Sequence, residues 1–324
     1  MSARLSVVVP VYNSEGTLRE LTERLASVLP QIAAEYELIL VNDGSVDDSW
    51  RVVEELIRTY PWVRGINLMR NYGQHNALLC GIRMAVYEVA VTIDDDLQNP
   101  PEEIPKLLAK LNEGFDVVYG KPVKTEQDLW RWAATRVTKV ALQPMMGEQV
   151  ASNVSAFRAL NTGVREGFDR YYAPFVNLDV LLTWGTSRFA AVPVAHHPRT
   201  VGRSNYTVAK LARHALNMMT GFSVLPLQLA SMIGFAFTAI GFLLFLYVIG
   251  RYLIQGVSVP GFPFLATVIV TFSGAQLFAL GIIGEYLARI HFRVMDRPAY
   301  VVRHEASSVH DPLAARLASH ESRK

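Results

Sequence analysis

Two long apolar stretches without a charged residue constrain the fold of this chain most. Leu229–Gly250 and Phe262–Gly284 contain no Asp, Glu, Lys or Arg, and each is long enough to cross about 30 Å of hydrocarbon as an α-helix. The alternative for the same two stretches is a helical hairpin buried in a protein core. Small residues recur in both stretches, which favours close packing of helices in lipid. The link Arg251–Gly261 is short and contains a proline, so we expect a tight hairpin with both ends on one side of a membrane.

Basic residues mark that side of the predicted hairpin. They are Arg199, Arg203, Lys210 and Arg213 before the first stretch and Arg289, Arg293, Arg297 and Arg303 after the second, against Arg251 alone between them. Cytoplasmic segments are enriched in Lys and Arg, so we expect a multi-pass protein of the inner (plasma) membrane with a cytoplasmic N-terminal domain. The first apolar run, Leu5–Val11, is too short for a secretion signal. The single cysteine, Cys80, excludes an internal disulfide and fits a reducing compartment.

The segments on either side of the two apolar stretches set the predicted domain boundaries. Tyr206–Phe222 alternates basic and apolar residues at roughly helical spacing, which predicts a helix in the membrane interface, with a buried amphipathic helix as the alternative. The tail after His304 is polar, and we expect its end to be disordered. The expected parts are a cytoplasmic domain over 1–205, an interfacial helix and connection over 206–228, the hairpin over 229–284, and a cytoplasmic C-terminal segment over 285–324. A net charge of only +2 gives no indication of nucleic acid as a partner, whereas the placed basic residues suit a lipid bilayer.

The N-terminal domain alternates short β-branched runs with helical stretches. The predicted strands are Leu5–Val9, Tyr36–Val41, Val63–Leu68, Val89–Ile93 and Asp116–Tyr119. This alternation is typical of an α/β fold with a mostly parallel sheet and helices on both faces. Ligands on such sheets bind beyond the carboxyl ends of the strands, so we expect the site there.

An acidic run follows the fourth of these strands. In the sequence Asp94-Asp95-Asp96-Leu97-Gln98, an extended backbone would direct Asp94 and Asp96 to the same side and Asp95 to the other. The first two carboxylates could then share one hard cation, Mg²⁺ or Mn²⁺, with Gln98 as a further oxygen donor, and such a cation can hold a diphosphate. An acidic turn that caps the next helix is the alternative for this motif alone.

Three other predicted strands end in polar motifs. They read Pro10-Val-Tyr-Asn-Ser-Glu15, Asn42-Asp-Gly-Ser-Val-Asp47 and Arg70-Asn-Tyr-Gly-Gln-His75. Each motif has a purely structural alternative. Asp43 with the following Gly and Ser could be no more than a turn before a helix. Tyr12 could be a core residue, and Arg70 and His75 could be solvated. Their occurrence at successive strand ends favours one shared site.

These motifs resemble those of the inverting family 2 glycosyltransferases with the GT-A nucleotide-sugar fold. Within that family the chain is similar to the membrane-bound polyprenyl-phosphate glycosyltransferases, a group that includes dolichyl-phosphate mannose synthases, bactoprenol glucosyltransferases and undecaprenyl-phosphate aminoarabinose transferases. The likeness runs from about Leu5 to Val302 and also includes R-x-x-G-x-S at Arg199, GEYLARI at Gly284 and RPAYVV at Arg297.

The resemblance implies roles for individual residues. The donor nucleotide would contact Pro10, Tyr12, Asn13, Asp43, Asp94, Lys121 and Lys124. The metal would be held by Asp94, Asp96 and Gln98. The acceptor lipid phosphate would be bound by Arg158, Arg199, Arg203 and Ser204, so that Asp94, Asp96, Arg158 and Arg199 would form the catalytic set.

The chain departs from the family pattern at four positions. Ser14 replaces a frequent glutamate, Ser152 a frequent aspartate near the acceptor and Asn205 a frequent lysine, while Asp95 stands where a small residue is usual. These departures leave the identity of any catalytic base open.

The implied reaction is inverting transfer of a sugar from a nucleotide-diphosphate sugar to a polyprenyl (undecaprenyl) phosphate at the cytoplasmic membrane face. A homo-oligomer is a further implication of the resemblance. One alternative is a processive polysaccharide synthase, but Gln127–Trp132 is one residue too long for its Q-x-x-R-W motif and lies too early. The other is a non-catalytic membrane scaffold with a decayed transferase domain, which the intact aspartates disfavour.

Overall fold

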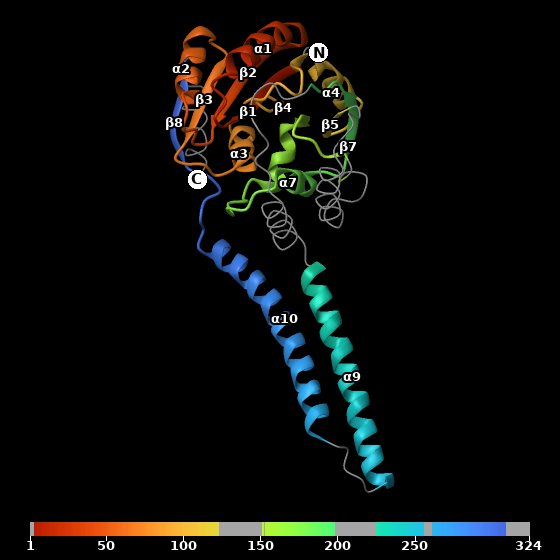
Figure 1. Cartoon of the computed structure of the whole chain (residues 1–324). Helices are drawn as coiled ribbons and strands as arrows, with labels where there is room; N and C mark the ends of the chain where they lie inside the picture. Colours follow the sequence, from red (N-terminus) through yellow and green to blue (C-terminus); the bar gives the residue numbers. More distant parts are fainter. Residues whose placement is uncertain (1–2, 123–150, 152, 198–224, 256–260, 309–324) are drawn as a thin grey trace, which may run out of the picture. The chain divides into compact units, whose positions relative to one another are not determined.

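The computed structural model describes residues 3–122, 151, 153–197, 225–255 and 261–308 (Figure 1). The chain divides into two compact units. One consists of Met1–Thr207 together with Asp296–Lys324, and the other of Val208–Met295. Each unit is described by itself.

An eight-stranded mixed sheet forms the centre of the first unit. The strands are β1 (Ala3–Val11), β2 (Ala33–Asn42), β3 (Val63–Leu68), β4 (Val89–Thr92), β5 (Val117–Pro122), β6 (Arg158–Asn161), β7 (Phe189–Val194) and β8 (Val302–Ser307). Their order across the sheet is β7-β5-β6-β4-β1-β2-β3-β8. Strands β4, β1, β2 and β3 pair in parallel, as do β5 and β7, whereas β6 and β8 run antiparallel to their neighbours. The predicted mostly parallel α/β sheet is therefore confirmed.

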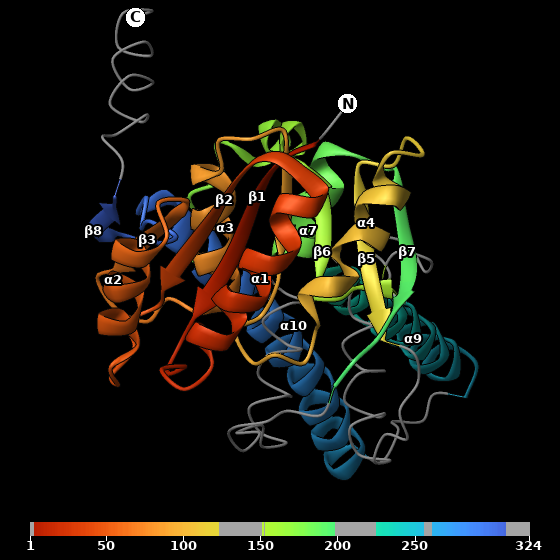
Figure 2. The ribbon, with the colours of Figure 1, turned by 90° about the horizontal axis from the view of Figure 1, so that it is seen from above.

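Helices cover both faces of this sheet, so the inner strands are buried on both sides (Figure 2). The helices are α1 (Leu18–Ile32), α2 (Ser49–Thr59), α3 (Gln74–Met84), α4 (Ile104–Leu111) and α7 (Leu178–Gly185), with short 3₁₀ helices η1 (Pro101–Glu103) and η2 (Thr162–Phe168). Helix α1 shows why these segments pack as they do. Its buried leucines, Leu18, Leu21, Leu25 and Leu29, recur every three or four residues and form one apolar face.

The five predicted strands are all present, and three further strands were not predicted. Strand β6 has only four residues, and β7 contains a proline. Strand β8 reads VRHEAS, which shows no alternation of apolar residues. Local patterns therefore could not separate these strands from loops.

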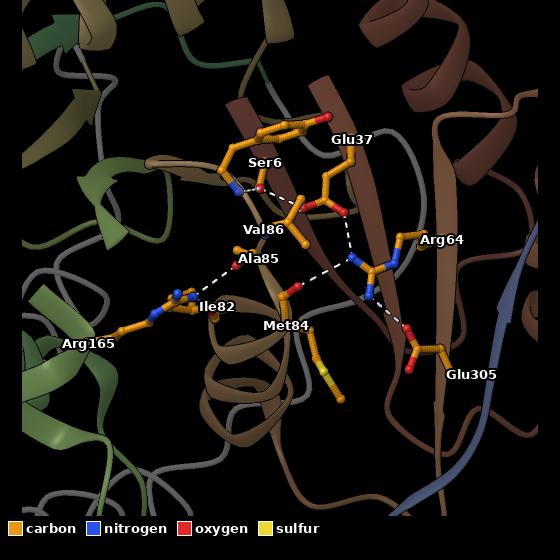
Figure 3. Close-up of polar contacts among 10 residues, drawn as sticks. Ser6, Glu37, Arg64, Ile82, Met84, Ala85, Val86, Arg165 and Glu305 are labelled. Carbon is orange, nitrogen blue, oxygen red and sulfur yellow. Dashed lines mark hydrogen bonds and ion pairs between the residues drawn. The ribbon is translucent and has the colours of Figure 1, made fainter. Parts of the chain in front are cut away.

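Strand β8 joins the sheet from the far end of the chain, beyond the second unit. It pairs antiparallel with β3, and Arg64 on β3 donates hydrogen bonds to Glu305 on β8 at 2.7 Å and to Glu37 on β2 at 2.6 Å (Figure 3). Glu37 also accepts a hydrogen bond from Ser6 at 2.7 Å, so this largely buried network links four strands. The segment predicted only as a cytoplasmic C-terminal piece thus contributes an edge strand.

The second unit consists of two long helices, α9 (Leu225–Gln255) and α10 (Phe262–Val294). They contact each other through the rings of Phe237 and Phe272, whose centroids are 5.6 Å apart. A Cβ atom on Gly241 would lie only 2.9 Å from the Phe272 ring, so a small residue permits this approach.

Among the described residues, one helix, Pro226–Arg251, is long and apolar enough to cross a membrane. The predicted first crossing thus corresponds to a helix with the required length and composition. Helix α10 contains the second predicted stretch, and that second crossing stays a prediction. The predicted interfacial helix over 206–222 and the tail beyond Ser308 lie outside the described residues.

Candidate active site

The polar ends of β1, β2, β3 and β4 meet at one edge of the sheet. Together with the first turn of α3 they line a cavity of about 250 Å³. The lining residues are Pro10, Val11, Tyr12, Asp43, Asn71, Gly73, Gln74, Asp94, Asp95 and Asp96. The four motifs predicted to share a site are therefore close together, as the parallel arrangement of these strands requires.

The acidic run forms a turn and does not continue the strand. Strand β4 ends at Thr92, a turn covers Asp95 and Asp96, and Leu97 has a positive φ of 60°. The extended geometry expected for this run is wrong, because the sheet ladder stops before the first aspartate. Asp94 and Asp96 nevertheless both line the cavity.

The three aspartates of this turn have different partners. Asp94 accepts a hydrogen bond from the Gln74 side chain at 2.7 Å, and Asp96 accepts one from the backbone of Gln98 at 3.2 Å. Asp95 instead faces the loop after β1 and accepts hydrogen bonds from the backbone N–H of Tyr12 at 3.1 Å and from the Ser14 hydroxyl.

The negative charge in this turn is only partly compensated. Burial, followed by the neighbouring charges of Asp96 and Asp95, raises the pKa of Asp94 to about 7. Such an excess of carboxylates favours a bound cation. Within the described part of the chain, no three acidic, His or Cys side chains converge on a single metal position. The turn thus suits a cation such as Mg²⁺, which takes one or two carboxylates from the protein and further oxygens from a diphosphate and water. Gln98, the third predicted ligand, is not among the lining residues.

Asp43 forms part of the cavity wall. Its carboxylate, 3% exposed, accepts hydrogen bonds from the backbone N–H groups of Tyr72 at 2.7 Å and Gly73 at 2.8 Å. Burial raises the pKa of Asp43 more than these two hydrogen bonds lower it. A carboxylate has about four acceptor sites, so Asp43 retains capacity for a ligand donor.

The loop after β2 lies against the loop after β3. Gly44 has a φ of +67°, and a Cβ atom at that position would be 2.5 Å from the backbone nitrogen of Asn71. Only glycine fits there, which explains the Asp-Gly-Ser sequence of the motif.

The predicted nucleotide-contacting residues separate into two groups. Pro10, Tyr12 and Asp43 line the cavity, with Tyr12 49% exposed. Asn13 does not, because its backbone N–H bonds to Ser45 Oγ at 3.0 Å and its side chain accepts from the backbone of Val46 at 2.9 Å. Asn13, with a φ of 54°, holds two loops together.

Lys121 lies at the exposed end of β5, where its Nζ contacts the Asn153 side chain at 3.2 Å, and it does not line the cavity. Lys124, Arg199, Arg203 and Ser204 lie outside the described residues.

Contrary to the prediction from the sequence, Arg158 does not lie in a loop. It is the first residue of strand β6, its side chain is 2% exposed, and its guanidinium forms an ion pair with the buried Asp179. The guanidinium also lies 5.6 Å from the Tyr119 ring centroid. Asp179 thus shares the charge of Arg158, and that charge also lowers the pKa of Asp94, against the larger effect of burial. The role of Arg158 at the acceptor phosphate stays a prediction.

The segment before Arg199 lies beside the aspartate turn. The backbone N–H of His197 donates to the carbonyl of Gln98 at 2.8 Å, and that of Ala195 donates to Glu103 at 3.2 Å. These contacts position the residues that precede the predicted acceptor loop in the sequence.

Sequence reasoning gave no individual role in the site to Asn71, Gly73, Gln74 or Asp95. The first three belong to the Arg70–His75 motif, whose position after a strand was the available signal. Asp95 was expected to point away from Asp94 and Asp96, but its partners Tyr12 and Ser14 were not predicted, since they come from a distant part of the chain.

The mixed sheet, with helices on both faces and a polar cavity at its strand ends, has the GT-A fold of glycosyltransferases. A family model described as glycosyl transferase family 2 matches residues 6–168. Undecaprenyl-phosphate 4-deoxy-4-formamido-L-arabinose transferase of Proteus mirabilis is 36% identical over 304 residues, which cover 93% of this chain and 93% of that protein. The protein of the same name from Pectobacterium atrosepticum is 33% identical over 320 residues, 98% of each chain. The chain therefore belongs to glycosyl transferase family 2, and the resemblance stated above is confirmed.

A solved structure supports the fold. Glucosyl-3-phosphoglycerate synthase from Mycobacterium tuberculosis, in complex with Mn²⁺ and UDP-glucose, is similar with a TM-score of 0.52 and 18% sequence identity. The match covers 67% of this chain and 77% of that one.

Proposed function

We propose that this glycosyltransferase moves a single sugar from a nucleotide-diphosphate sugar to a polyprenyl phosphate, most specifically undecaprenyl phosphate. The observation that carries the proposal is the cavity that Asp43, Asp94 and Asp96 line together. The named activity of the relatives, which match 93–98% of the chain, supports undecaprenyl phosphate as the acceptor.

In the proposed reaction, a phosphate oxygen of the lipid bonds to the anomeric carbon while the bond from that carbon to the diphosphate breaks. The electron pair leaves with the nucleoside diphosphate, and the sugar configuration inverts. A phosphate monoester has a second pKa of about 6, so the nucleophile is largely ionised at neutral pH without a strong base. Replacement of the frequent aspartate by Ser152 is compatible with this chemistry.

The protein side chains have separate tasks in this proposal. Tyr12 and Asp43 hold the nucleotide, and Asp94 and Asp96 hold Mg²⁺ or Mn²⁺. The cation, when bound, neutralises charge on the departing diphosphate. The Mn²⁺ in the complex of the M. tuberculosis synthase supports a divalent ion in this fold.

The acceptor site is proposed to include Arg199, Arg203 and Ser204. Arg199 is two residues beyond His197 in the sequence, and the backbone N–H of His197 donates to the carbonyl of Gln98 in the aspartate turn. Arginine suits the task because its planar fork binds two phosphate oxygens. Helices α9 and α10 are proposed to form the membrane hairpin that brings the lipid headgroup to a cytoplasmic active site, with a homo-oligomer as a further proposal.

The test is an assay of the full chain in nanodiscs with undecaprenyl phosphate, Mn²⁺ and a panel of radiolabelled nucleotide sugars that includes UDP and GDP derivatives. The product is then extracted into organic solvent and resolved by thin-layer chromatography. We expect one sugar per lipid and loss of transfer when EDTA removes the cation. A polymer would indicate a processive synthase, and no product with any donor would indicate a non-catalytic scaffold.

A further inference from the structure

Asp95 connects the aspartate turn to the loop after β1. One of its carboxylate oxygens, Oδ2, accepts hydrogen bonds from the backbone N–H of Tyr12 at 3.1 Å and from the hydroxyl of Ser14. The Ser14 hydroxyl also lies 3.1 Å from the carbonyl oxygen of Tyr12. A side chain from the β4 end of the site therefore holds two polar groups of the Tyr12 loop.

The other hydrogen bonds of this loop lead away from the aspartates. The backbone N–H of Asn13 donates to Ser45 at 3.0 Å, and that of Ser14 donates to Ser49 at 2.8 Å. Both acceptors belong to the segment after β2. Asp95 thus supplies the tie that connects Tyr12 with the proposed metal-binding turn.

The position of Tyr12 depends on this tie for a simple geometric reason. Its ring is half exposed and lines the cavity, so few packing contacts hold it. Among the described residues, Asp95 is the acceptor of the Tyr12 backbone N–H. Without that acceptor, the loop would lose its link to the aspartate turn while it kept its links to Ser45 and Ser49.

The same contacts separate Asp95 from its two neighbours. Asp94 and Asp96 have partners on the α3 side of the turn and within the turn itself. The shared Oδ2 of Asp95 is occupied by protein donors from a third segment. A carboxylate that already accepts two hydrogen bonds there loses them if it rotates toward a cation.

We propose that Asp95 is a positioning residue that sets Tyr12 for the donor nucleotide and does not ligate the metal. The inference rests on the proposed nucleotide-sugar donor. It deepens that function, because it assigns the three adjacent aspartates two separate tasks: Asp94 and Asp96 bind the cation and Asp95 orders the nucleotide loop.

The test uses two variants of the full chain in nanodiscs. Asp95→Ala removes the acceptor, whereas Asp95→Asn keeps an oxygen that can accept from the Tyr12 N–H. We expect Asp95→Ala to raise the donor KM about tenfold with a much smaller change in kcat, because it breaks a hydrogen bond to a charged group. Asp95→Asn should restore most of the donor affinity, and the Mn²⁺ concentration for half-maximal activity should stay unchanged in both.

A matched control removes a carboxylate that has no contact with the Tyr12 loop among the described residues. Asp48 is exposed and pairs with Arg51 at 2.8 Å, so Asp48→Ala tests whether loss of a nearby negative charge alone changes the donor KM. Equal increases in Asp48→Ala and Asp95→Ala would overturn the inference.

A second measurement is independent of any nucleotide or metal. Hydrogen–deuterium exchange of the peptide that contains Tyr12 should be faster in Asp95→Ala than in the wild type or Asp95→Asn, because the N–H of Tyr12 loses its acceptor. Unchanged exchange overturns the positioning role even if the wild type transfers sugar. If exchange is faster in Asp95→Ala but the wild type transfers no sugar, the positioning role stands and the proposed function alone is contradicted. If Asp95→Asn shifts the Mn²⁺ requirement as strongly as Asp96→Asn, Asp95 is a metal ligand and the inference is wrong.

Discussion

Arg158 and Asp179 form an ion pair in which both side chains are almost fully buried. The hydroxyl of Tyr119 donates a further hydrogen bond to the same carboxylate at 3.1 Å. The pair therefore joins strands β5 and β6 to helix α7. A family-based assignment of Arg158 to the acceptor phosphate does not take this partner into account.

The first prediction follows from the buried pair. Arg158→Ala should lower the free energy of unfolding by about 3–5 kcal/mol, because Asp179 is left as an uncompensated buried charge. The double variant Arg158→Met with Asp179→Asn should recover much of this loss, since a neutral amide still accepts from Tyr119. Urea unfolding of the full chain in detergent measures both changes. If the double variant is stable but has an acceptor KM raised as far as in Arg158→Ala, Arg158 does bind the acceptor.

A second prediction concerns the pH dependence of the metal-free protein. The pKa of Asp94 is raised to about 7 in the folded state from its usual value of 3.8, so the folded protein binds this proton more tightly than the unfolded chain. The stabilisation by this group is complete below the unfolded pKa and is lost as the pH rises to about 7. In the presence of EDTA, Asp94→Asn should therefore be more stable than the wild type at pH 8, by a few degrees in Tm, and similar to it near pH 4. Equal Tm values at both pH values would contradict the shift.

Asp96 provides the third prediction, on the metal. Asp96→Asn should leave the protein folded and inserted in the membrane but nearly inactive, because one anionic oxygen for the cation becomes a neutral amide. The change should also raise the Mn²⁺ concentration needed for the remaining activity. Near-normal turnover at saturating Mn²⁺ would remove Asp96 from the metal site.

The fourth prediction separates the acceptor from the donor. Arg199→Ala should raise the KM for polyprenyl phosphate and slow transfer, while the affinity for the nucleotide sugar stays within about twofold. Arg199→Lys should rescue only part of the loss, because an ammonium group lacks the guanidinium fork. Steady-state kinetics with each substrate varied in turn provide the measurement. Equal losses for both substrates would exclude a specific acceptor role.

Membrane topology is the subject of the fifth prediction. Cys80 is the single cysteine of the chain, so in a Cys80→Ser background any reaction with a thiol reagent comes from the introduced cysteine. A cysteine at Ser258, in the link between the two helices, should react with a membrane-impermeant maleimide from outside intact cells, and one at the exposed Ser307 only after lysis. Reaction of both from the same side would disprove two full crossings.

The extent to which the sequence predicts this structure depends on how local each signal is. Val63–Leu68 was predicted with the bounds that the structure shows. The cavity followed from four motifs that each end a predicted strand. The roles of Arg158 and Asp95 could not be predicted, because their partners Asp179, Tyr12 and Ser14 are 21, 83 and 81 residues away along the chain. The periodicity of apolar residues along the sequence does not indicate side-chain contacts between such distant residues.

Strand β8 sets the order in which this enzyme can be completed during synthesis. Residues 302–307 leave the ribosome after both α9 and α10, yet they cover the edge of β3 and supply Glu305 to Arg64. In the same segment, the carbonyl of Ala299 accepts a hydrogen bond at 2.6 Å from Asn76, in the first turn of α3 beside the cavity. Until that segment emerges, the edge of β3 remains open and Asn76 lacks this acceptor. The catalytic domain therefore reaches its final form only after α9 and α10 have been made, so a chain that is cut short within either helix cannot yield a finished transferase.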